Sequence, residues 1–200
     1  MFQNHTANDI QSDGLTHSSI WCIVKDNQGT LWLGTYFGGV NYFNPEYEIY
    51  TRYSYSSNEK QGLSNPVVGR TIEDKNGNLW IGTEGGGLNY FNRRTREFKW
   101  YRPQEGRNSI SHNNVKALYY DADKEIIWIG THLGGLNRLD IRSGHFTHYR
   151  MEDNNRQTLP SDIVRDIIPY KDLLIVATQN GVCLFDPCLL YTSDAADEGL

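Results

Sequence analysis

Four short segments of the sequence differ from one another although the residues around them repeat. They are Tyr36-Phe37, Glu84-Gly85, His132-Leu133 and Gln179-Asn180, each placed after a Thr and before a Gly. Side chains that vary inside a constant frame are free to acquire a function. Aromatic rings stack on sugar rings, and carboxylate, imidazole and amide groups hydrogen-bond their hydroxyls. These residue types therefore indicate carbohydrate binding.

A second set of candidate residues lies about fifteen positions earlier in each case. We expect these residues near the start of a strand at the inner rim of the fold, and two arginines among them suit an acidic sugar or a sulfate. The full set of candidate ligand-binding residues is Trp21, Tyr36, Phe37, Arg70, Glu84, Lys116, His132 and Arg165.

Acid–base chemistry has one candidate pair, Glu84 and His132, because a lyase-like protein could use residues of this kind from adjacent repeats. The sequence shows no Ser-His-Asp order, phosphate-binding Gly loop or paired carboxylates apart from the repeats. We therefore assign no catalytic residue and expect no cofactor.

Metal binding is not indicated. In His145-x-x-His148 the two imidazoles would point to opposite faces of a strand. Asp26 and Asp74 lack the further carboxylates of a calcium loop, so we expect them to cap turns. The three cysteines, Cys22, Cys183 and Cys188, have neither the spacing of a metal site nor that of a disulfide framework.

Composition narrows the class of protein. Of the 200 residues, 38% are hydrophobic and 22% are charged, which excludes a disordered chain and a membrane-spanning one. The formal net charge is -5, whereas a duplex-binding domain normally carries a basic excess, so we expect no nucleic-acid partner. The 19 glycines and 12% aromatic residues together favour strands joined by tight turns.

The elements that position the candidate residues are internal repeats. Leu31-Trp32-Leu33-Gly34-Thr35 recurs 48 residues later at Leu79–Thr83 and again at Ile127–Thr131, with a divergent fourth copy at Leu174–Thr178. Each unit also contains a hairpin signal, a Gly-Gly pair and an aromatic stretch. In the first unit these features predict strands at Ile20 to Lys25, Leu31 to Thr35, Gly39 to Phe43 and Tyr47 to Tyr53.

Four strands in each unit of 47–48 residues predict an all-β fold, a partial β-propeller of about three to four blades. A sheet that is apolar on both faces must stack on neighbouring sheets. We expect the repeated tryptophans to fill the space between blades, the repeated glycines to permit close approach, and the repeated asparagines to bond the backbone. These structural residues are Trp32, Trp80, Trp128, Gly34, Gly82, Gly130, Asn41, Asn89 and Asn137.

Both ends are expected to be incomplete. Residues 2–5 resemble Phe146–Tyr149, which predicts that the chain begins in the last strand of an earlier blade, and the run from Cys188 to Glu198 resembles the translation of a transposase-type sequencing adapter. The predicted divisions are an earlier blade and loop at 1–13, blades at 14–61, 62–108 and 109–157, a partial blade at 158–187, and a non-native tail at 188–200.

The repeated unit, Asp-x-x-Gly-x-Leu-Trp-[Ile/Leu]-Gly-Thr-x-x-Gly-Gly-[Val/Leu]-Asn, resembles the two-component regulator propeller repeat. Asp26 to Asn41 and Asp74 to Asn89 match it throughout. The third copy lacks the hairpin Gly, and the fourth lacks both the Trp and that Gly. The resemblance covers roughly residues 14 to 187.

The resemblance implies the periplasmic sensor region of a hybrid two-component histidine kinase, many of which respond to oligosaccharides. It implies an oligosaccharide or another small periplasmic ligand, the remaining blades of the same chain as packing partners, and a homodimeric parent protein. The fragment itself is expected not to be an enzyme. WD40 and Kelch repeats fit less well. A streptogramin-lyase-like or quinoprotein-like enzyme and a protein-binding scaffold remain alternatives.

Overall fold

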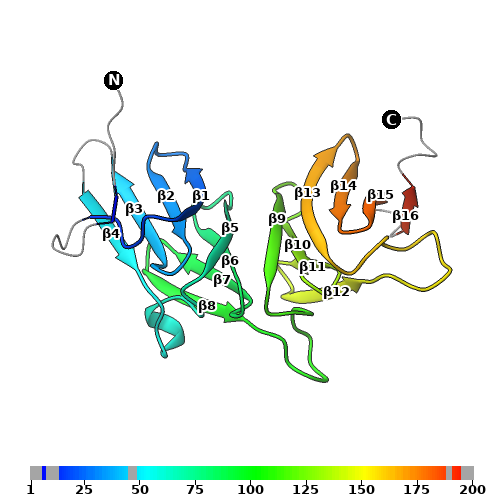
Figure 1. Ribbon diagram of the computed structural model, residues 1–200, viewed down its shortest axis with the longest axis horizontal. Coiled ribbons are helices and arrows are strands. Elements are labelled where there is room, and N and C mark those ends of the chain that lie inside the picture. The colour runs from blue at the N-terminus through cyan, green and yellow to red at the C-terminus, as the bar shows by residue number, and fades with distance from the viewer. Residues whose placement is uncertain (1–5, 8–13, 45–48, 188–190, 195–200) are drawn as a thin grey trace. The chain divides into compact units, whose positions relative to one another are not determined.

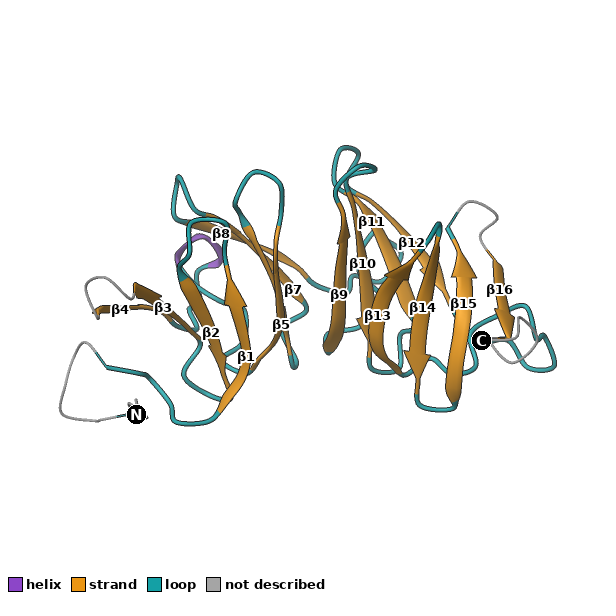
Figure 2. Cartoon of the chain, turned by 90° about the horizontal axis from the view of Figure 1, so that it is seen from above, coloured by secondary structure: helices purple, strands orange, loops and turns teal. Residues whose placement is uncertain are grey.

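The computed structural model describes residues 6–7, 14–44, 49–187 and 191–194. The regular elements of the described residues are strands joined by turns and loops, with one short 3-10 helix, η1 (Glu59–Gln61). It divides into two compact units, Met1–Tyr101 and Arg102–Leu200. Each unit contains two four-stranded antiparallel sheets whose strands lie side by side in chain order (Figures 1 and 2).

The strand bounds follow the repeat. Unit 1 contains β1 (Ile20–Lys25), β2 (Leu31–Thr35), β3 (Val40–Asn44) and β4 (Ile49–Tyr53), then β5 (Val68–Glu73), β6 (Leu79–Thr83), β7 (Leu88–Asn92) and β8 (Glu97–Tyr101). Unit 2 contains β9 (Val115–Asp121), β10 (Ile126–Thr131), β11 (Leu136–Asp140) and β12 (His145–Tyr149), then β13 (Val164–Tyr170), β14 (Leu173–Thr178), β15 (Gly181–Asp186) and β16 (Tyr191–Asp194).

The hairpin between the first two strands of the first sheet is built around an aspartate. Asp26 Oδ1 accepts hydrogen bonds from the backbone N–H groups of Gln28 and Thr30, both at 2.9 Å, and Asp26 Oδ2 accepts one from the Trp32 indole at 2.9 Å. Gly29 completes the turn with φ +86, a conformation that glycine adopts without strain. One carboxylate thus fixes both the turn and the repeated tryptophan.

The second hairpin repeats this arrangement and the third does not. Asp74 Oδ1 accepts from the backbone of Asn76 and Asn78, and Asp74 Oδ2 accepts from the Trp80 indole at 3.2 Å. In the third repeat the pairing of β9 with β10 is shifted by one residue relative to the other two hairpins. Within the described part of the chain, the buried Trp128 indole nitrogen has no hydrogen-bond partner.

Each unit has its own core between its two sheets. Trp32 is 2% exposed and packs among Val68 and Ile81 of the next sheet, and Trp128 is 1% exposed and packs among Val164 and Val176. The glycine after each tryptophan permits this close approach. A Cβ at Gly34 would lie 2.7 Å from Val68 Cγ1, and one at Gly130 would lie 2.5 Å from Val164 Cγ1.

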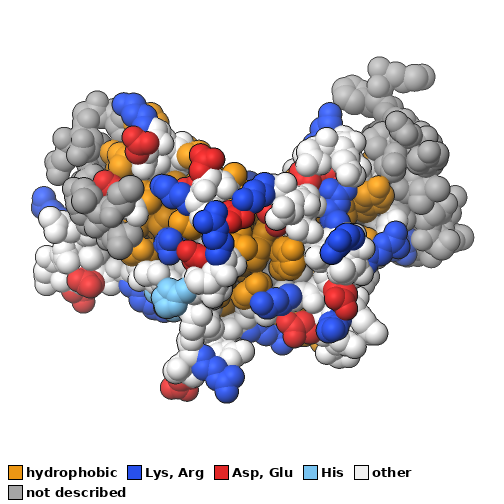
Figure 3. Space-filling model, turned by 180° about the vertical axis from the view of Figure 1, so that it is seen from behind, with side chains coloured by type: hydrophobic (Ala, Val, Ile, Leu, Met, Phe, Trp, Pro, Cys, Tyr) orange, Lys and Arg blue, Asp and Glu red, His pale blue; other side chains and the backbone are white. Residues whose placement is uncertain are grey.

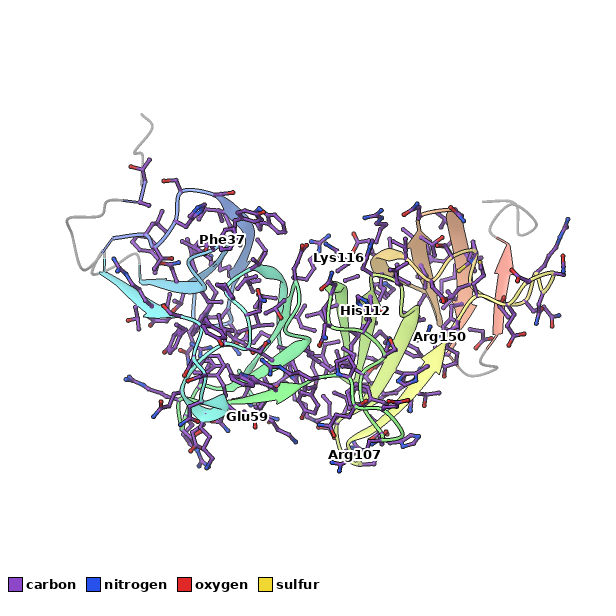
Figure 4. All side chains as sticks on the ribbon, turned by 60° about the horizontal axis from the view of Figure 1, so that its bottom comes forward. Phe37, Glu59, Arg107, His112, Lys116 and Arg150 are labelled. Atoms are coloured by element: carbon purple, nitrogen blue, oxygen red, sulfur yellow. The ribbon has the colours of Figure 1, made fainter. Side chains whose placement is uncertain are left out.

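The loop before a sheet also covers that sheet's outer strand. Glu59, labelled in Figure 4, accepts a hydrogen bond from the backbone N–H of Trp100 in β8 at 2.7 Å. Asn108 Oδ1 likewise accepts a hydrogen bond from the backbone N–H of Phe146 in β12 at 2.7 Å. Side chains that occupy the backbone donors of an edge strand hinder its pairing with other chains.

The predicted fold class, a partial β-propeller, is confirmed by the four antiparallel four-stranded sheets. The fourth sheet is completed by β16, which pairs with β15 and lies in the segment predicted to be a non-native tail. The predictions for residues 1–5, 8–13, 188–190 and 195–200 fall outside the described residues. No helix within the described ranges is long and apolar enough to cross a membrane.

Candidate functional site

The connection between the second and third strands has the same frame in the first three sheets. In β2–β3 the Thr35 hydroxyl donates to the Gly39 carbonyl at 2.9 Å and accepts from the Gly38 N–H at 2.8 Å. Thr83 and Thr131 donate to the carbonyls of Gly87 and Gly135 in the same way. The threonine of the repeated motif therefore closes the turn that contains the variable residues.

The second glycine of the Gly-Gly pair cannot vary. Gly39 and Gly135 have φ of +75 and +71, and a Cβ on either would lie 2.2 Å from a carbonyl oxygen, that of Tyr53 or Tyr149. A side chain is therefore excluded both by the backbone conformation and by space. Diversity in this turn is confined to the two residues between the threonine and the glycines.

In the first sheet the variable residues form an exposed aromatic cluster, defined here as Trp21, Tyr36 and Phe37. Their side chains are 45%, 38% and 57% exposed. The Trp21 and Tyr36 rings have centroids 4.9 Å apart, and those of Tyr36 and Phe37 are 4.6 Å apart. The Tyr36 N–H donates to the Ser19 carbonyl at 3.1 Å, which holds the turn beside β1.

The second sheet places Glu84 and Arg70 in the corresponding positions. The Glu84 N–H donates to the Val67 carbonyl at 3.0 Å, so Glu84 lies next to the start of β5. Arg70 is exposed on β5. Burial raises the pKa of the Cys22 thiol on the neighbouring β1, and the hydrogen bond to Thr71 and the charge of Arg70 are among the effects that oppose the rise.

In the third sheet His132 lies beside a second imidazole, that of His112. The ring centroids are 6.3 Å apart, and His132 Nδ1 is buried with no hydrogen-bond partner among the described residues. Burial lowers the pKa of His112, and the neighbouring His132 lowers it further. Lys116 is the second residue of β9, and Figure 4 labels it together with His112.

The fourth sheet brings two predicted positions into contact. Arg165 of β13 donates from Nη2 to Oε1 of Gln179 at 3.0 Å. Gln179 occupies the variable turn of this sheet, and its N–H donates to the Ile163 carbonyl at 2.9 Å. A residue of the sheet's first strand thus contacts a residue of the variable turn here, as Trp21 contacts Tyr36 in the first sheet.

The structure therefore groups the predicted residues sheet by sheet. Trp21, Tyr36 and Phe37 are in contact in the first sheet of unit 1. The predicted acid–base pair is split between the units, because Glu84 belongs to unit 1 and His132 to unit 2. The pairing of these two residues remains a prediction.

Sequence reasoning missed two histidines at this end of the sheets. His17 lies 6.3 Å from Tyr36 by ring centroids, and His112 lies beside His132. Both accept a backbone hydrogen bond at Nδ1 from the residue two positions later. Asn65 makes the equivalent bond in the second repeat. Alignment of the loops that precede the first strands would have identified this variable position.

The repeated asparagines bond the loop that leads into the first strand of their own sheet. Asn89 Oδ1 accepts from the Ser64 N–H at 2.8 Å, and its Nδ2 donates to the Ser64 hydroxyl at 2.8 Å. Asn41 and Asn137 bond Thr16 and Ser111 in the same manner. These contacts position the loops beside the variable turns.

Metal-ligating side chains do not gather at this end. Among the residues with described placement, no group of three or more His, Cys, Asp or Glu side chains could hold a metal ion. Cys22 and Cys183 are not disulfide-bonded. The site offers aromatic faces, imidazoles and hydrogen-bonding groups.

Comparison with known families identifies the repeats. Residues 14–37, 62–85 and 109–132 match the family described as two component regulator propeller. The first two segments end with the variable turns Tyr36-Phe37 and Glu84-Gly85, and the third ends at His132. A comparison with curated proteins finds no match.

Solved structures share the fold. The extracellular domain of the B. thetaiotaomicron protein BT3049, described as a hybrid two component system, superposes with a TM-score of 0.78 at 24% identity, and the match covers 96% of this chain and 26% of that one. The extracellular domain of BT4673 from the same organism superposes with a TM-score of 0.70 at 23% identity, and the match covers 88% of this chain and 22% of that one. This chain therefore spans about a quarter of these neighbours.

A propeller enzyme has the same fold at lower similarity. Virginiamycin B lyase from Staphylococcus aureus gives a TM-score of 0.63 at 11% identity, with 84% of this chain and 53% of that chain covered. At these identities all three structures establish the propeller fold alone.

Proposed function

We propose that this chain is part of the extracytoplasmic ligand-sensing propeller of a hybrid two-component histidine kinase, and that the ligand is an oligosaccharide. The family match of three repeats supports the sensor class. The extracellular domains with the same fold support an extracytoplasmic, periplasmic location. On this proposal the chain contributes binding, and phosphoryl transfer belongs to a kinase domain elsewhere in the parent protein.

The observation that carries the proposal is the exposed aromatic cluster. Trp21 and Phe37 are about half exposed, although large apolar side chains normally lie inside a protein. A contiguous exposed aromatic surface is typical of a binding site, and flat rings are what the apolar face of a sugar stacks on. His17, next to Tyr36, supplies a hydrogen-bonding group beside the rings.

Isothermal titration calorimetry of the chain with neutral gluco-, xylo-, arabino- and manno-oligosaccharides tests the proposal. We expect one of these to bind, and Tyr36→Ala to weaken binding about tenfold, because stacking on one ring contributes about 1 kcal/mol or more. Tyr55→Ala is the matched control, because Tyr55 is 55% exposed but lies outside the cluster. Equal loss in both variants, or no binding by any oligosaccharide, would contradict the proposal.

A further inference from the structure

Unit 1 contains a cavity of about 460 Å³ between its two sheets. Its lining comes from the β1–β2 and β5–β6 hairpins and from the turn between β7 and β8, residues 93–96. In antiparallel sheets these connections lie at the opposite end from the β2–β3 turn that carries Tyr36. The cavity is therefore separate from the aromatic cluster, and its volume is within the usual range for ligand pockets, roughly 300–1,000 Å³.

The floor of the cavity is aromatic. Trp32, Tyr42, Tyr53 and Phe91 all line it. The Trp32 ring is stacked with Tyr53 at 6.0 Å between centroids and meets Tyr42 edge-on at 5.0 Å. Tyr53 and Phe91 are 4.6 Å apart. Tyr42 and Tyr53 are partly exposed, and the buried rings of Trp32 and Phe91 pack against them, so the apolar surface open to a ligand is that of the two tyrosines.

The rim is cationic. The 93–96 turn contributes Arg93, Arg94 and Arg96 to the lining. The turn is held by Asn92, whose Oδ1 accepts from the N–H groups of Arg94 and Thr95 at 3.0 Å and whose carbonyl accepts from the Arg96 N–H at 2.8 Å. The arginines therefore project from a fixed backbone.

Arg93 and the other two arginines differ in role. Arg93 contacts Asp26 at 2.8 Å and Glu73 at 3.2 Å, so its charge is balanced within the protein. Arg96 and Tyr53 line the same cavity, and the charge of Arg96 opposes the rise that burial causes in the pKa of Tyr53. No carboxylate among the described residues lines the cavity. Cationic side chains border exposed hydrophobic ones on unit 1, at the right of Figure 3.

The repeats provide an internal control for this cationic rim. The residues 48 positions after Arg93, Arg94 and Arg96 are Ile141, Arg142 and Gly144, so the next repeat keeps an arginine at one of the three positions and lacks those of Arg93 and Arg96. In unit 2 a smaller cavity of about 230 Å³ lies at the corresponding hairpins, and its charged lining residues are of both signs: Asp121, Asp123, Asp172, Lys124 and Lys171. The fold alone therefore does not demand a positive rim.

We propose that the unit 1 cavity is a second binding site, for a sugar-sized ring that carries one carboxylate or sulfate group. The ring would lie on Tyr42 and Tyr53, and the anion would be bound by the guanidinium groups of Arg94 and Arg96, which suit oxyanions. This inference does not depend on the sensor proposal, because it concerns the other end of the sheets and a different ligand charge.

The test is calorimetry of the full chain with glucuronate, glucose 6-sulfate and glucose. We expect at least one anionic sugar to bind at least tenfold more tightly than glucose. Arg94→Ser/Arg96→Gly should reduce that affinity at least tenfold. Glycine suits position 96 because Arg96 has φ +59. The control Arg107→Ser/Arg156→Ser removes the same charge from exposed positions in unit 2 and should bind as the unmodified chain does.

The carboxylate and sulfate arms identify which anion the site prefers, and either preference supports the proposal. Equal affinity for glucose and both anions would overturn it, as would unchanged binding by Arg94→Ser/Arg96→Gly. Binding that is lost in Trp21→Ala but retained in the arginine variant would assign the anion to the aromatic cluster and also overturn it. Thermal unfolding of each variant establishes that a loss of binding is not a loss of fold.

Discussion

Arg93 Nη2 lies 2.8 Å from Asp26 Oδ2 and so joins the second sheet of unit 1 to the first hairpin. The Asp26 side chain is completely buried and that of Arg93 is 18% exposed. The guanidinium also lies over the Trp32 ring, 5.2 Å from its centroid. The Asp26 carboxylate thus accepts hydrogen bonds from its own turn and from Trp32, and also pairs with Arg93 of the neighbouring sheet.

We predict that Asp26→Ala destabilises the chain by about 3 kcal/mol or more, because it leaves the Arg93 charge without this buried partner. Arg93→Ala should lower the free energy of unfolding by a similar amount, because it leaves the buried Asp26 carboxylate without its cationic partner. The double variant should cost clearly less than the sum of the two, as measured by urea unfolding. Additive losses would show that the pair does not couple the sheets.

The same carboxylate predicts an acid dependence of stability. Burial alone would raise the pKa of Asp26, but the Trp32 and Thr30 hydrogen bonds and the Arg93 charge outweigh it, so the pKa lies below its ordinary value. A depressed folded-state pKa stabilises the fold above the unfolded-state pKa of about 3.9, and this contribution is lost as pH falls through the folded-state value.

Asp26→Asn should therefore differ from the unmodified chain most at neutral pH. Urea unfolding from about pH 6 down to about pH 2.5 should show the difference in unfolding free energy shrinking below about pH 4. A difference that stays constant across this range would mean that the charge of Asp26 contributes nothing.

The repeated tryptophans should respond unequally to Trp→Phe substitution. Trp80 donates to Asp74, so Trp80→Phe leaves a buried acceptor without this donor. Trp128 has no partner for its indole N–H among the described residues, so Trp128→Phe removes an unsatisfied buried donor. We expect Trp80→Phe to cost about 1–2 kcal/mol more in urea unfolding. Equal costs would show that the hydrogen bond to Asp74 has no net effect.

Two glycines in the third repeat separate strain from steric clash. Gly144 has φ +70 with open space around the missing Cβ, whereas Gly135 has φ +71 with a carbonyl oxygen 2.2 Å from that position. Gly144→Ala should cost about 1 kcal/mol from the left-handed backbone alone. Gly135→Ala should cost about 3 kcal/mol or more, because the turn must also move. Thermal unfolding of the two variants compares them directly.

We expect His112 to give the folding stability a second pH dependence, near neutral pH. Burial, followed by the nearby His132 and Arg150 charges, lowers the pKa of His112 below 6.5. The unfolded chain then binds the proton more tightly, so this residue makes stability fall as pH decreases through about 6.5, until the folded-state pKa is passed.

The matched variant is His112→Asn, because Asn65 makes the same backbone hydrogen bond in the second repeat. Its unfolding free energy should change less between about pH 7.5 and about pH 5 than that of the unmodified chain. An identical slope in both proteins would exclude His112 as the source.

Much of the fold was predictable because the repeat gives the same pattern several times. The predicted strands Ile20 to Lys25 and Leu31 to Thr35 coincide with β1 and β2, and the third was placed one residue early, since β3 is Val40–Asn44. The Asp–Trp spacing occurs twice, so its structural role could be inferred. The short helix η1 carries no periodic apolar signal and was not predicted.

The cross-sheet contacts were not predictable in the same way. Arg93 follows Asp26 by 67 positions, and nothing in either local sequence indicates the other. The sequence of the cationic turn at 93–96 is that of an ordinary polar turn. Only the structure shows that the turn borders the aromatic residues of the cavity. His112 escaped notice because its neighbour His132 is twenty residues away, and their proximity depends on how the loops pack.

The most direct test of the proposed sensor site uses the indole N–H signals of the five tryptophans in a two-dimensional ¹H–¹⁵N NMR titration. When a neutral oligosaccharide that binds is added, the chemical shift of the Trp21 indole signal should change until the site is saturated. The signals of the buried Trp80 and Trp128 should keep their positions. Saturable binding that leaves the Trp21 signal unmoved would contradict the assignment of the aromatic cluster as the site of recognition.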